Sequence, residues 1–427
     1  MKWLCGYLHS SRRPSPGTPI RPHKPSANSI PGVLIRLHNP IHCSGCPVEG
    51  EIRLVLWQLR EDGIEHVRLE LRGRATTRVT RGHPAQTETI PLVHIDIPLW
   101  TYEGLEDEPD LGHVLVSKSF SFQLPPELPP TLYNSGRTTE AEVKYAITVV
   151  GVRPEDPQHH RRMHIPIVVV PPSDNRQLLD VKARLSGTVT MADIVPWRTE
   201  RAEKRIRRAP WGRHATAQVQ LTIPDLSALP LYTKILFVID ILTTSPLLTR
   251  AKADTSSQHR PVFPAVPAEF TMLEFKLRRR ISLRAGTLKD DVSSDVATFT
   301  KAALVISAVQ AETPPSRWQP LPDADEKSAG ALGRWVQRSS FRSTFQLACA
   351  PSFTTETIDC QYSLELTVPF AGAGNDVRIS WPIRVSSGLD APAARDKLDS
   401  PAPLLALENF LDLPLLYWDA NVDEWDG

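Results

Sequence analysis

The sequence lacks long apolar runs and is poor in cysteine. No stretch reaches the about 18 apolar residues that a membrane-spanning helix requires, so we expect no transmembrane helix. The apolar stretch Leu4–Leu8 is too short and too polar for the core of a secretory signal. The chain has only 5 cysteines in 427 residues, which does not fit a disulfide framework. These features predict a cytoplasmic protein in a reducing environment.

The chain also lacks an excess of either charge, and it has little glycine for its proline. Its 49 Lys and Arg residues face 48 Asp and Glu residues, so the net charge is +1. Nucleic-acid-binding domains usually carry a basic excess, and we therefore expect no nucleic-acid partner. The 40 prolines outnumber the 21 glycines. So much proline predicts many turns and strand ends instead of long helices.

What the sequence does contain is apolar alternation with a period of two. Residues 52–56, 67–71, 143–149 and 219–223 alternate apolar and polar side chains, as do residues 341–347 and 362–368. Each such run is typical of a β-strand with one buried face. No long segment shows the 3.6-residue period of a helix. Many short strands separated by proline-rich turns predict an all-β protein built from antiparallel sandwiches.

Composition divides the chain into four segments. Residues 1–31 are rich in Pro, Ser, Arg and His, and we expect a disordered arm. Residues 32–172 and 178–388 hold the predicted strands, and a Pro-Pro-Ser-Asp-Asn hinge separates the two blocks. Residues 389–427 form an acidic, mostly disordered tail in this interpretation.

Several segments, in order along the chain, resemble the arrestin family, and most closely the fungal α-arrestin-related proteins. In the first block these are residues 45–56 (GCPVEGEIRLVL), 64–73 (IEHVRLELRG), 120–132 (FSFQLPPELPPTL) and 143–152 (VKYAITVVGV). In the second block they are residues 350–358 (APSFTTETI), 362–368 (YSLELTV) and 369–375 (PFAGAGN). The resemblance implies two tandem immunoglobulin-like arrestin β-sandwiches with disordered termini.

The resemblance also implies a function. It predicts a non-catalytic adaptor without a cofactor, which links membrane cargo or receptor tails to endocytic and ubiquitin-ligase machinery, in the cytoplasm or peripherally at the plasma membrane or endosomes. Ligase-recruiting members often carry Pro-Pro-x-Tyr, but the nearest match here is Pro414-Leu-Leu-Tyr417. Direct recruitment through this motif is therefore not expected. Two alternatives stay open: a structural subunit of a retromer-like trafficking complex, and an unrecognised enzyme.

The strongest charge feature is the segment Arg198–Arg213, which we expect to be a loop. It holds seven basic and two acidic residues, a net charge of +5. One hypothesis is transient contact with anionic lipid or with a phosphorylated partner; the alternatives are a solvated loop and a nuclear-localisation signal. The candidate contact residues are Arg198, Arg201, Lys204, Arg205, Arg207, Arg208 and Arg213.

A second basic run and the tail give two further candidates. Arg68, Arg72, Arg74, Arg78 and Arg81 are candidate contacts for an acidic segment, or else a solvated strand face. The tail residues from Asp399 onward include seven acidic residues and no Lys or Arg. Large apolar residues lie among them and suggest a short recognition motif, which docks on the basic first block or meets a partner. The candidate motif is Phe410, Leu413, Pro414, Tyr417 and Trp418.

Three other motifs favour ordinary structural roles. Cys43 and Cys46 form one Cys-x-x-Cys pair, which Cys349 and Cys360 could complete as a zinc site, but turn and strand cysteines are the preferred interpretation. The glycine-rich residues 372–375 precede no helix pattern and predict a hairpin turn. Residues 159–162 (HHRR) lie between two strand patterns and predict a solvated hairpin tip. We find no catalytic motif.

Overall fold

The computed structural model describes most of the chain between residues 30 and 389. The described residues are 30–39, 41–81, 84–102, 115–155, 160–173, 196–208, 212–249, 262–300, 309–321, 331–389 and Leu413. The predicted disordered arm, except Ile30 and Pro31, and nearly all of the predicted tail lie outside these residues, as do Asp174 and Asn175 of the predicted hinge. Ile30 itself is buried in the core.

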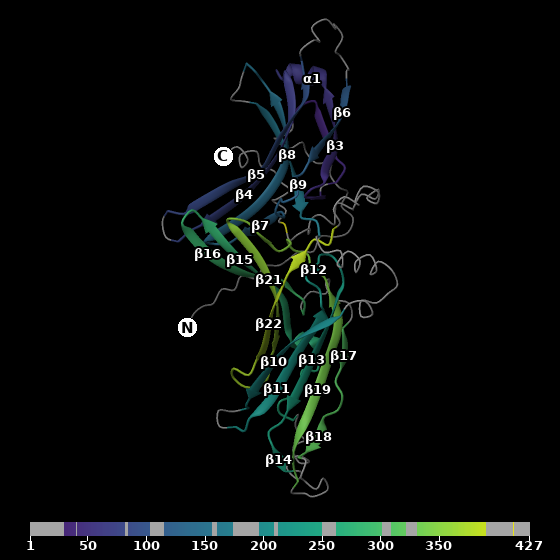
Figure 1. Ribbon diagram of the computed structural model, residues 1–427, viewed down its shortest axis with the longest axis vertical. Helices are drawn as coiled ribbons and strands as arrows, with labels where there is room; N and C mark the ends of the chain where they lie inside the picture. The colour runs from purple at the N-terminus through teal and green to yellow at the C-terminus, as the bar shows by residue number, and fades with distance from the viewer. Residues whose placement is uncertain are drawn as a thin grey trace, which may run out of the picture.

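The protein is all-β, as its alternating pattern predicts (Figure 1). Strands β1 to β9 form two sheets, which we call the N-terminal sheets. The smaller has the order β1-β3-β6 and the larger β2-β9-β8-β4-β5, with β7 added at β8. All pairs are antiparallel except β2 with β9. Their bounds are β1 Val33–Leu37, β2 Ile41–Cys43, β3 Pro47–Val55, β4 His66–Val79, β5 Gln86–Thr101, β6 Leu115–Gln123, β7 Leu132–Ser135, β8 Thr139–Val152 and β9 Arg161–Val170.

Strands β10 to β23 form the C-terminal sheets. One has the order β10-β11-β13-β19-β14, with β17 and β18 also paired to β19; the facing one has the order β16-β15-β21-β20, with β22 paired to β21. A short parallel pair, β12 with β23, completes them. Their bounds are β10 Trp197–Ile206, β11 Ala215–Pro224, β12 Leu229–Pro230, β13 Ile235–Thr244, β14 Leu248–Thr249, β15 Glu274–Ala285, β16 Leu288–Thr298, β17 Gln310–Glu312, β18 Arg317–Pro320, β19 Leu332–Phe345, β20 Phe353–Thr354, β21 Ile358–Val368, β22 Val377–Ile383 and β23 Val385–Ser386.

Facing sheets pack through the apolar residues of their alternating strands. In the C-terminal sheets, Phe237 of β13 contacts Phe275 of β15 across the core, with ring centroids 5.2 Å apart. Phe299 and Phe345 lie 4.8 Å apart beside them. Aromatic pairs at these distances add stability beyond the burial of their area. This packing makes a sandwich of the two sheets.

Two short helices interrupt the strands in the described residues. Helix α1 spans Leu56–Glu61 directly after β3, and the 3₁₀-helix η3 spans Phe270–Met272. The alternation at residues 52–56 predicts strand up to Leu56, but Leu56 starts α1 and buries its side chain together with Leu59. A single helical turn is too short to show a helical period in the sequence.

The N-terminal and C-terminal sheets meet end to end, where β15 and β16 lie beside β4 and β5 (Figure 1). Within the described residues, no strand before residue 171 pairs with a strand after residue 196. Side chains join the two parts instead. Thr77 Oγ1 donates to Arg284 O at 2.6 Å, and Gly286 N donates to Glu88 Oε2 at 2.7 Å. We call this contact region the joint.

Candidate functional site

The basic segment predicted as a loop is largely a strand. Residues Trp197–Ile206 form β10, which pairs along its whole length with β11. β10 lies at the end of its sheet, and most of its residues are exposed. The expectation of a loop is therefore wrong for this part. A strand with charged side chains on both faces lacks the apolar alternation that identifies half-buried strands, and charge is typical of edge strands.

Four of the seven predicted basic residues are engaged by neighbouring groups. The Arg198 guanidinium lies 5.3 Å from the centroid of the Trp381 ring. Lys204 Nζ donates to Gly374 O at 2.7 Å and to Asp376 O at 3.0 Å. The Arg207 main chain bonds to Asn375, and Arg213 Nη1 donates to Leu247 O at 2.9 Å. Arg198, Lys204 and Arg207 are thus tied to β22 and its preceding turn, and Arg213 to the chain just before β14.

The other three basic residues are free. Arg201, Arg205 and Arg208 are exposed, and within the described part of the chain no acidic side chain pairs with them. Glu203, between two of them on β10, accepts a hydrogen bond from Gln218 Nε2 at 2.8 Å instead. Residues 197–208 hold six basic and two acidic residues, a net charge of +4. We call residues 197–208 the β10 basic edge.

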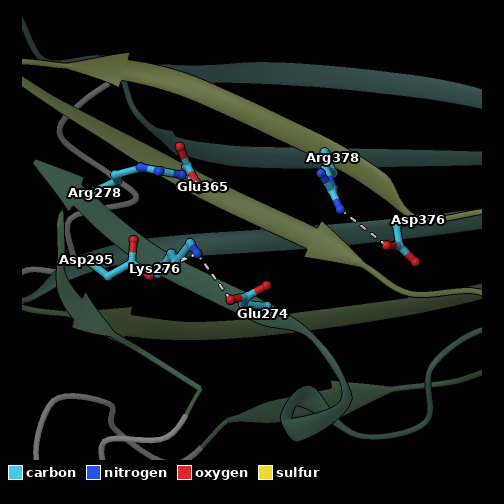
Figure 2. A network of polar contacts seen from close by, with 7 residues as sticks. All are labelled: Glu274, Lys276, Arg278, Asp295, Glu365, Asp376 and Arg378. Atoms are coloured by element: carbon cyan, nitrogen blue, oxygen red, sulfur yellow. Dashed lines mark hydrogen bonds and ion pairs between the residues drawn. The ribbon is translucent and has the colours of Figure 1, made fainter. Parts of the chain in front are cut away.

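The outer face of the facing sheet shows the opposite arrangement, because its cations are paired (Figure 2). Lys276 Nζ contacts Asp295 Oδ2 at 3.0 Å and Glu274 Oε1 at 3.2 Å. The hydrogen bond to Asp295 is the largest cause of the raised pKa of Lys276. Arg278 pairs with Glu365 at 3.3 Å and Arg378 with Asp376 at 3.5 Å. These three cations are therefore neutralised by carboxylates of the same face, unlike the exposed arginines of the β10 basic edge.

The second predicted basic run lies on β4 and just beyond it. Arg68 and Arg72 flank Glu70, whose side chain is 1 % exposed, with ion-pair distances of 2.9 Å and 2.5 Å. Arg68 also pairs with Asp96 at 2.9 Å. Glu70 and Asp96 largely neutralise Arg68 and Arg72. These two arginines are therefore weaker candidates for binding an acidic partner than the β10 basic edge.

The remaining members of that run have separate positions. Arg74 is half-buried on β4 and has partners of its own, and Arg78 is exposed near the end of the strand. Arg81 lies at the joint, where its Nη2 donates to Asp290 Oδ1 at 3.2 Å. The structure thus places the five arginines in four different surroundings. Their role as contacts for an acidic segment stays a prediction.

Of the predicted tail motif, only Leu413 is described, and it is buried, with 4 % of its surface exposed. Phe410, Pro414, Tyr417 and Trp418 lie outside the described residues. Whether the tail recognises a partner or docks on the basic face therefore stays a prediction.

The cysteines lie in two separate places. Cys43 is buried at the end of β2 and Cys46 lies in the following turn, whereas the buried Cys349 and Cys360 lie after β19 and on β21. In the described residues, no group of three or more His, Cys, Asp or Glu side chains is placed to hold a metal. Burial raises the pKa of the Cys360 thiol to about 11, and Cys360 Sγ lies 3.5 Å from the Tyr362 hydroxyl.

Two predicted turns can be located. Gly372 and Gly374 both have positive φ, and Asn375 beside them bonds to Arg207 across the sandwich edge. The predicted hairpin turn therefore also borders the β10 basic edge. Of the HHRR segment, His159 lies outside the described residues, His160 accepts a bond from Arg153 N at 3.1 Å, and residues 161–162 begin β9.

The sequence interpretation missed the polar contacts of the joint. Arg279 is 6 % exposed, and its Nη2 donates to Asn134 Oδ1 at 3.0 Å. A hollow of about 350 Å³ also lies between the two parts, lined by residues 126–130, 171–173, 227–228, 351–355 and 384–387. An arginine inside an otherwise alternating strand is the only sequence signal of this contact, and it does not identify the partner.

The chain matches no protein-family model and no curated protein. The arrestin resemblance therefore rests on the segments quoted above. In the described residues, no helix is both long enough and apolar enough to cross a membrane.

Proposed function

We propose that this protein is a non-catalytic, arrestin-like adaptor that links membrane cargo or receptors to endocytic and ubiquitination machinery. It works in the cytoplasm, with transient contact at membranes. The segments that resemble the family lie on or beside strands of an all-β fold, as an arrestin-like protein requires. Without an intact Pro-Pro-x-Tyr motif, any ligase is reached through another contact or another protein.

The observation that carries this proposal is the β10 basic edge. Its free cations Arg201, Arg205 and Arg208 are exposed. Arg201 and Arg205 lie on β10, which fixes their spacing, and Arg208 lies just beyond its end. Cations that the protein does not neutralise itself are available to an anionic partner, and they increase the rate of encounter with it. Acidic cytoplasmic segments of cargo are such partners.

Proximity labelling in cells tests the proposal. The wild-type protein should label membrane cargo and endocytic or ubiquitin-ligase proteins, and the variant R201Q/R205Q/R208Q should lose the cargo signal. The variant K276Q/R278Q/R378Q is the matched control, since it removes three cations that are paired on the outer face in Figure 2. A labelled set without membrane or endocytic proteins would contradict the adaptor function. One stable stoichiometric complex would favour a structural trafficking subunit.

A further inference from the structure

The backbone of β10 has a free edge, and its hydrogen-bonding direction can be assigned. The register pairs Trp197 with Pro224 and Ile206 with Ala215. Continuing this register by one residue places Pro196 opposite Asp225. Asp225 N donates to Pro196 O at 2.6 Å, so Pro196 and Asp225 form a hydrogen-bonded pair. Hydrogen-bonded and non-bonded pairs alternate along antiparallel strands. The even-numbered residues of β10 therefore bond to β11, and the odd-numbered residues direct their N–H and C=O groups away from it.

Arg207 supports this assignment. As an odd-numbered residue it should direct its backbone outward, and Asn375 meets it there. Asn375 Oδ1 accepts from Arg207 N at 3.4 Å, and Asn375 Nδ2 donates to Arg207 O at 2.9 Å. The side-chain amide thus takes the position that a neighbouring strand would occupy. The same outward groups of Thr199, Arg201, Glu203 and Arg205 have no strand beside them in the described part of the chain.

The space beside this edge is open. A hollow of about 460 Å³ is lined by Ala202, Glu203 and Lys204 of β10 and by four residues of the turn and β22, namely Gly374, Asp376, Val377 and Arg378. Lys204 Nζ donates hydrogen bonds to the carbonyls of Gly374 and Asp376, and so links β10 to the turn before β22. The turn closes the edge at Arg207 and leaves Thr199 to Arg205 accessible. Seven residues of an extended chain span about 20 Å, which matches this length.

We propose that β10 takes up an extended acidic segment of a partner protein as an additional strand. This inference rests on the adaptor function proposed above and specifies how the partner is held. Backbone hydrogen bonds provide the affinity in strand addition, and alternate side chains provide the specificity. A second copy of this chain would bring the same charge of +4 to the edge, so charge complementarity favours an acidic partner.

Side-chain spacing makes the specificity explicit. Arg201, Glu203 and Arg205 share the outer face of β10, because alternate residues of a strand point the same way. Residues directly opposite each other on paired strands interact most strongly. The preferred segment therefore has acidic residues four positions apart, opposite the two arginines. It has a neutral or basic residue midway between them, opposite Glu203.

A membrane surface is a less suitable occupant. Lipid headgroups would meet the cations but would leave the outward N–H and C=O groups of the edge without partners. In addition, the inward-facing cations Arg198 and Lys204 are already engaged by Trp381 and by backbone carbonyls. The row of outward backbone groups is the feature that a peptide satisfies and a lipid does not.

Fluorescence anisotropy with the full-length protein and labelled, end-blocked heptapeptides tests the proposal. One peptide has acidic residues at positions 1 and 5, lysine at 3 and β-branched residues between them; the control has the same composition with lysine at 1 and acidic residues at 3 and 5. The first should bind about fivefold more tightly, since two cross-strand pairs change from repulsive to attractive. The variant R201Q/R205Q should reduce this preference, because only the pair opposite Glu203 then still distinguishes the two peptides. Equal binding of the two peptides would contradict the assigned spacing.

Two variants at one position separate strand addition from simple charge attraction. Glu203→Pro removes an outward N–H while leaving the backbone bonds to β11 intact, and Glu203→Ala keeps that N–H. Both variants lose the side-chain bond from Gln218 equally. We expect Glu203→Pro to weaken binding at least about fivefold and Glu203→Ala to bind within about twofold of wild type. Thermal unfolding of both variants shows that the fold is retained. Equal binding by the two variants would overturn strand addition but would leave the charge-dependent adaptor function in place.

Two further binding measurements, with lipid vesicles and with a truncated chain, identify other occupants of the edge. If vesicles containing phosphatidylserine bind the β10 basic edge and no peptide does, the surface is a membrane site and the proposal is wrong. If the peptide binds a chain that ends at Asp399 but not the full chain, then the protein's own tail occupies the edge. That result would also overturn the proposal of a partner segment.

Discussion

Burial controls the ionisation of individual side chains in this fold. His42 lies on β2 with 6 % of its surface exposed, and its Nε2 has no hydrogen-bond partner in the described structure. Burial lowers the pKa of His42 to about 4. Burial likewise raises the pKa of Tyr362, whose hydroxyl donates to Ala350 O at 2.8 Å. Both residues are thus neutral at pH 7 for the same physical reason, desolvation of the charged form.

His42 should make the folded state sensitive to mild acid. Its pKa is about 4 when folded and about 6.5 when unfolded, so the unfolded state takes up a proton first as the pH falls below about 6.5. Between pH 7 and pH 5 this linkage removes about 2 kcal/mol from the free energy of unfolding. Urea unfolding at the two pH values should show a correspondingly smaller loss for His42→Gln. The same pH dependence in both proteins would mean that His42 is protonated in the folded state.

Glu70 should contribute far more to stability than an exposed carboxylate. It is 1 % exposed and contacts both Arg68 and Arg72. Glu70→Gln leaves two cations without their shared partner in a mostly buried site, and we expect a loss of about 2 kcal/mol. Glu365→Gln, which removes the more exposed partner of Arg278, should change the free energy of unfolding by less than about 1 kcal/mol. Chemical denaturation measures both, and equal effects would contradict the argument from burial.

At the scale of elements, edge position and close packing determine how each strand is used. β10 is exposed on both faces because it ends its sheet, whereas β8 lies between β4 and β9 and is almost wholly buried. β4 approaches the ring of Tyr145 on β8 so closely at Gly73 that an added Cβ would lie 2.5 Å from it. Tyr145 in turn donates its hydroxyl proton to Pro129 O at 2.7 Å, which fixes the ring.

Gly73→Ala should therefore destabilise the protein by about 1–3 kcal/mol, because the added methyl group overpacks a closed core. Gly136→Ala is the comparison, since its added Cβ would lie no closer than 3.3 Å to a neighbouring atom. We expect a change within about 0.5 kcal/mol there. Thermal and urea unfolding of the two variants provide the measurement. A mild effect at Gly73 would show that Tyr145 can shift to make room.

At the scale of the whole molecule, the joint holds two groups of sheets end to end (Figure 1). Its contacts differ in burial. The Arg279 to Asn134 hydrogen bond is buried, whereas Arg81 pairs with Asp290 at the exposed rim. A buried cation depends on its hydrogen-bond partner, but a rim cation is hydrated when its partner is lost. The buried contact should therefore control the relative position of the two parts.

Asn134→Ala should loosen the joint. We expect a loss of about 2 kcal/mol or more, because Arg279 keeps its burial and loses its acceptor. Small-angle scattering should show a larger radius of gyration, and hydrogen exchange should increase in β4 and β15 together. Arg81→Ala should change stability by less than about 1 kcal/mol and leave the scattering profile unchanged. Identical behaviour of the two variants would contradict a joint controlled by its buried contact.

The sequence alone determined the fold class and the longest half-buried strands that show apolar alternation. Apolar side chains with a period of two at residues 52–54, 143–149 and 362–368 belong to strands because only that spacing places them on one buried face. The many prolines predicted few long helices, because proline lacks the backbone N–H that a helix interior requires. The sequence also showed that the cations of the β10 basic edge are concentrated in one short segment.

Only the tertiary structure decided which of these cations are free. Arg201 and Arg278 look alike in the sequence, but one lies on an unpartnered edge and the other meets Glu365 from a strand 87 residues away. The same holds for Arg279, whose acceptor Asn134 comes from the other part of the molecule. Periodicity reports which face of a strand is buried. It does not report which strand lies next to it, because pairing brings together residues that are distant along the chain.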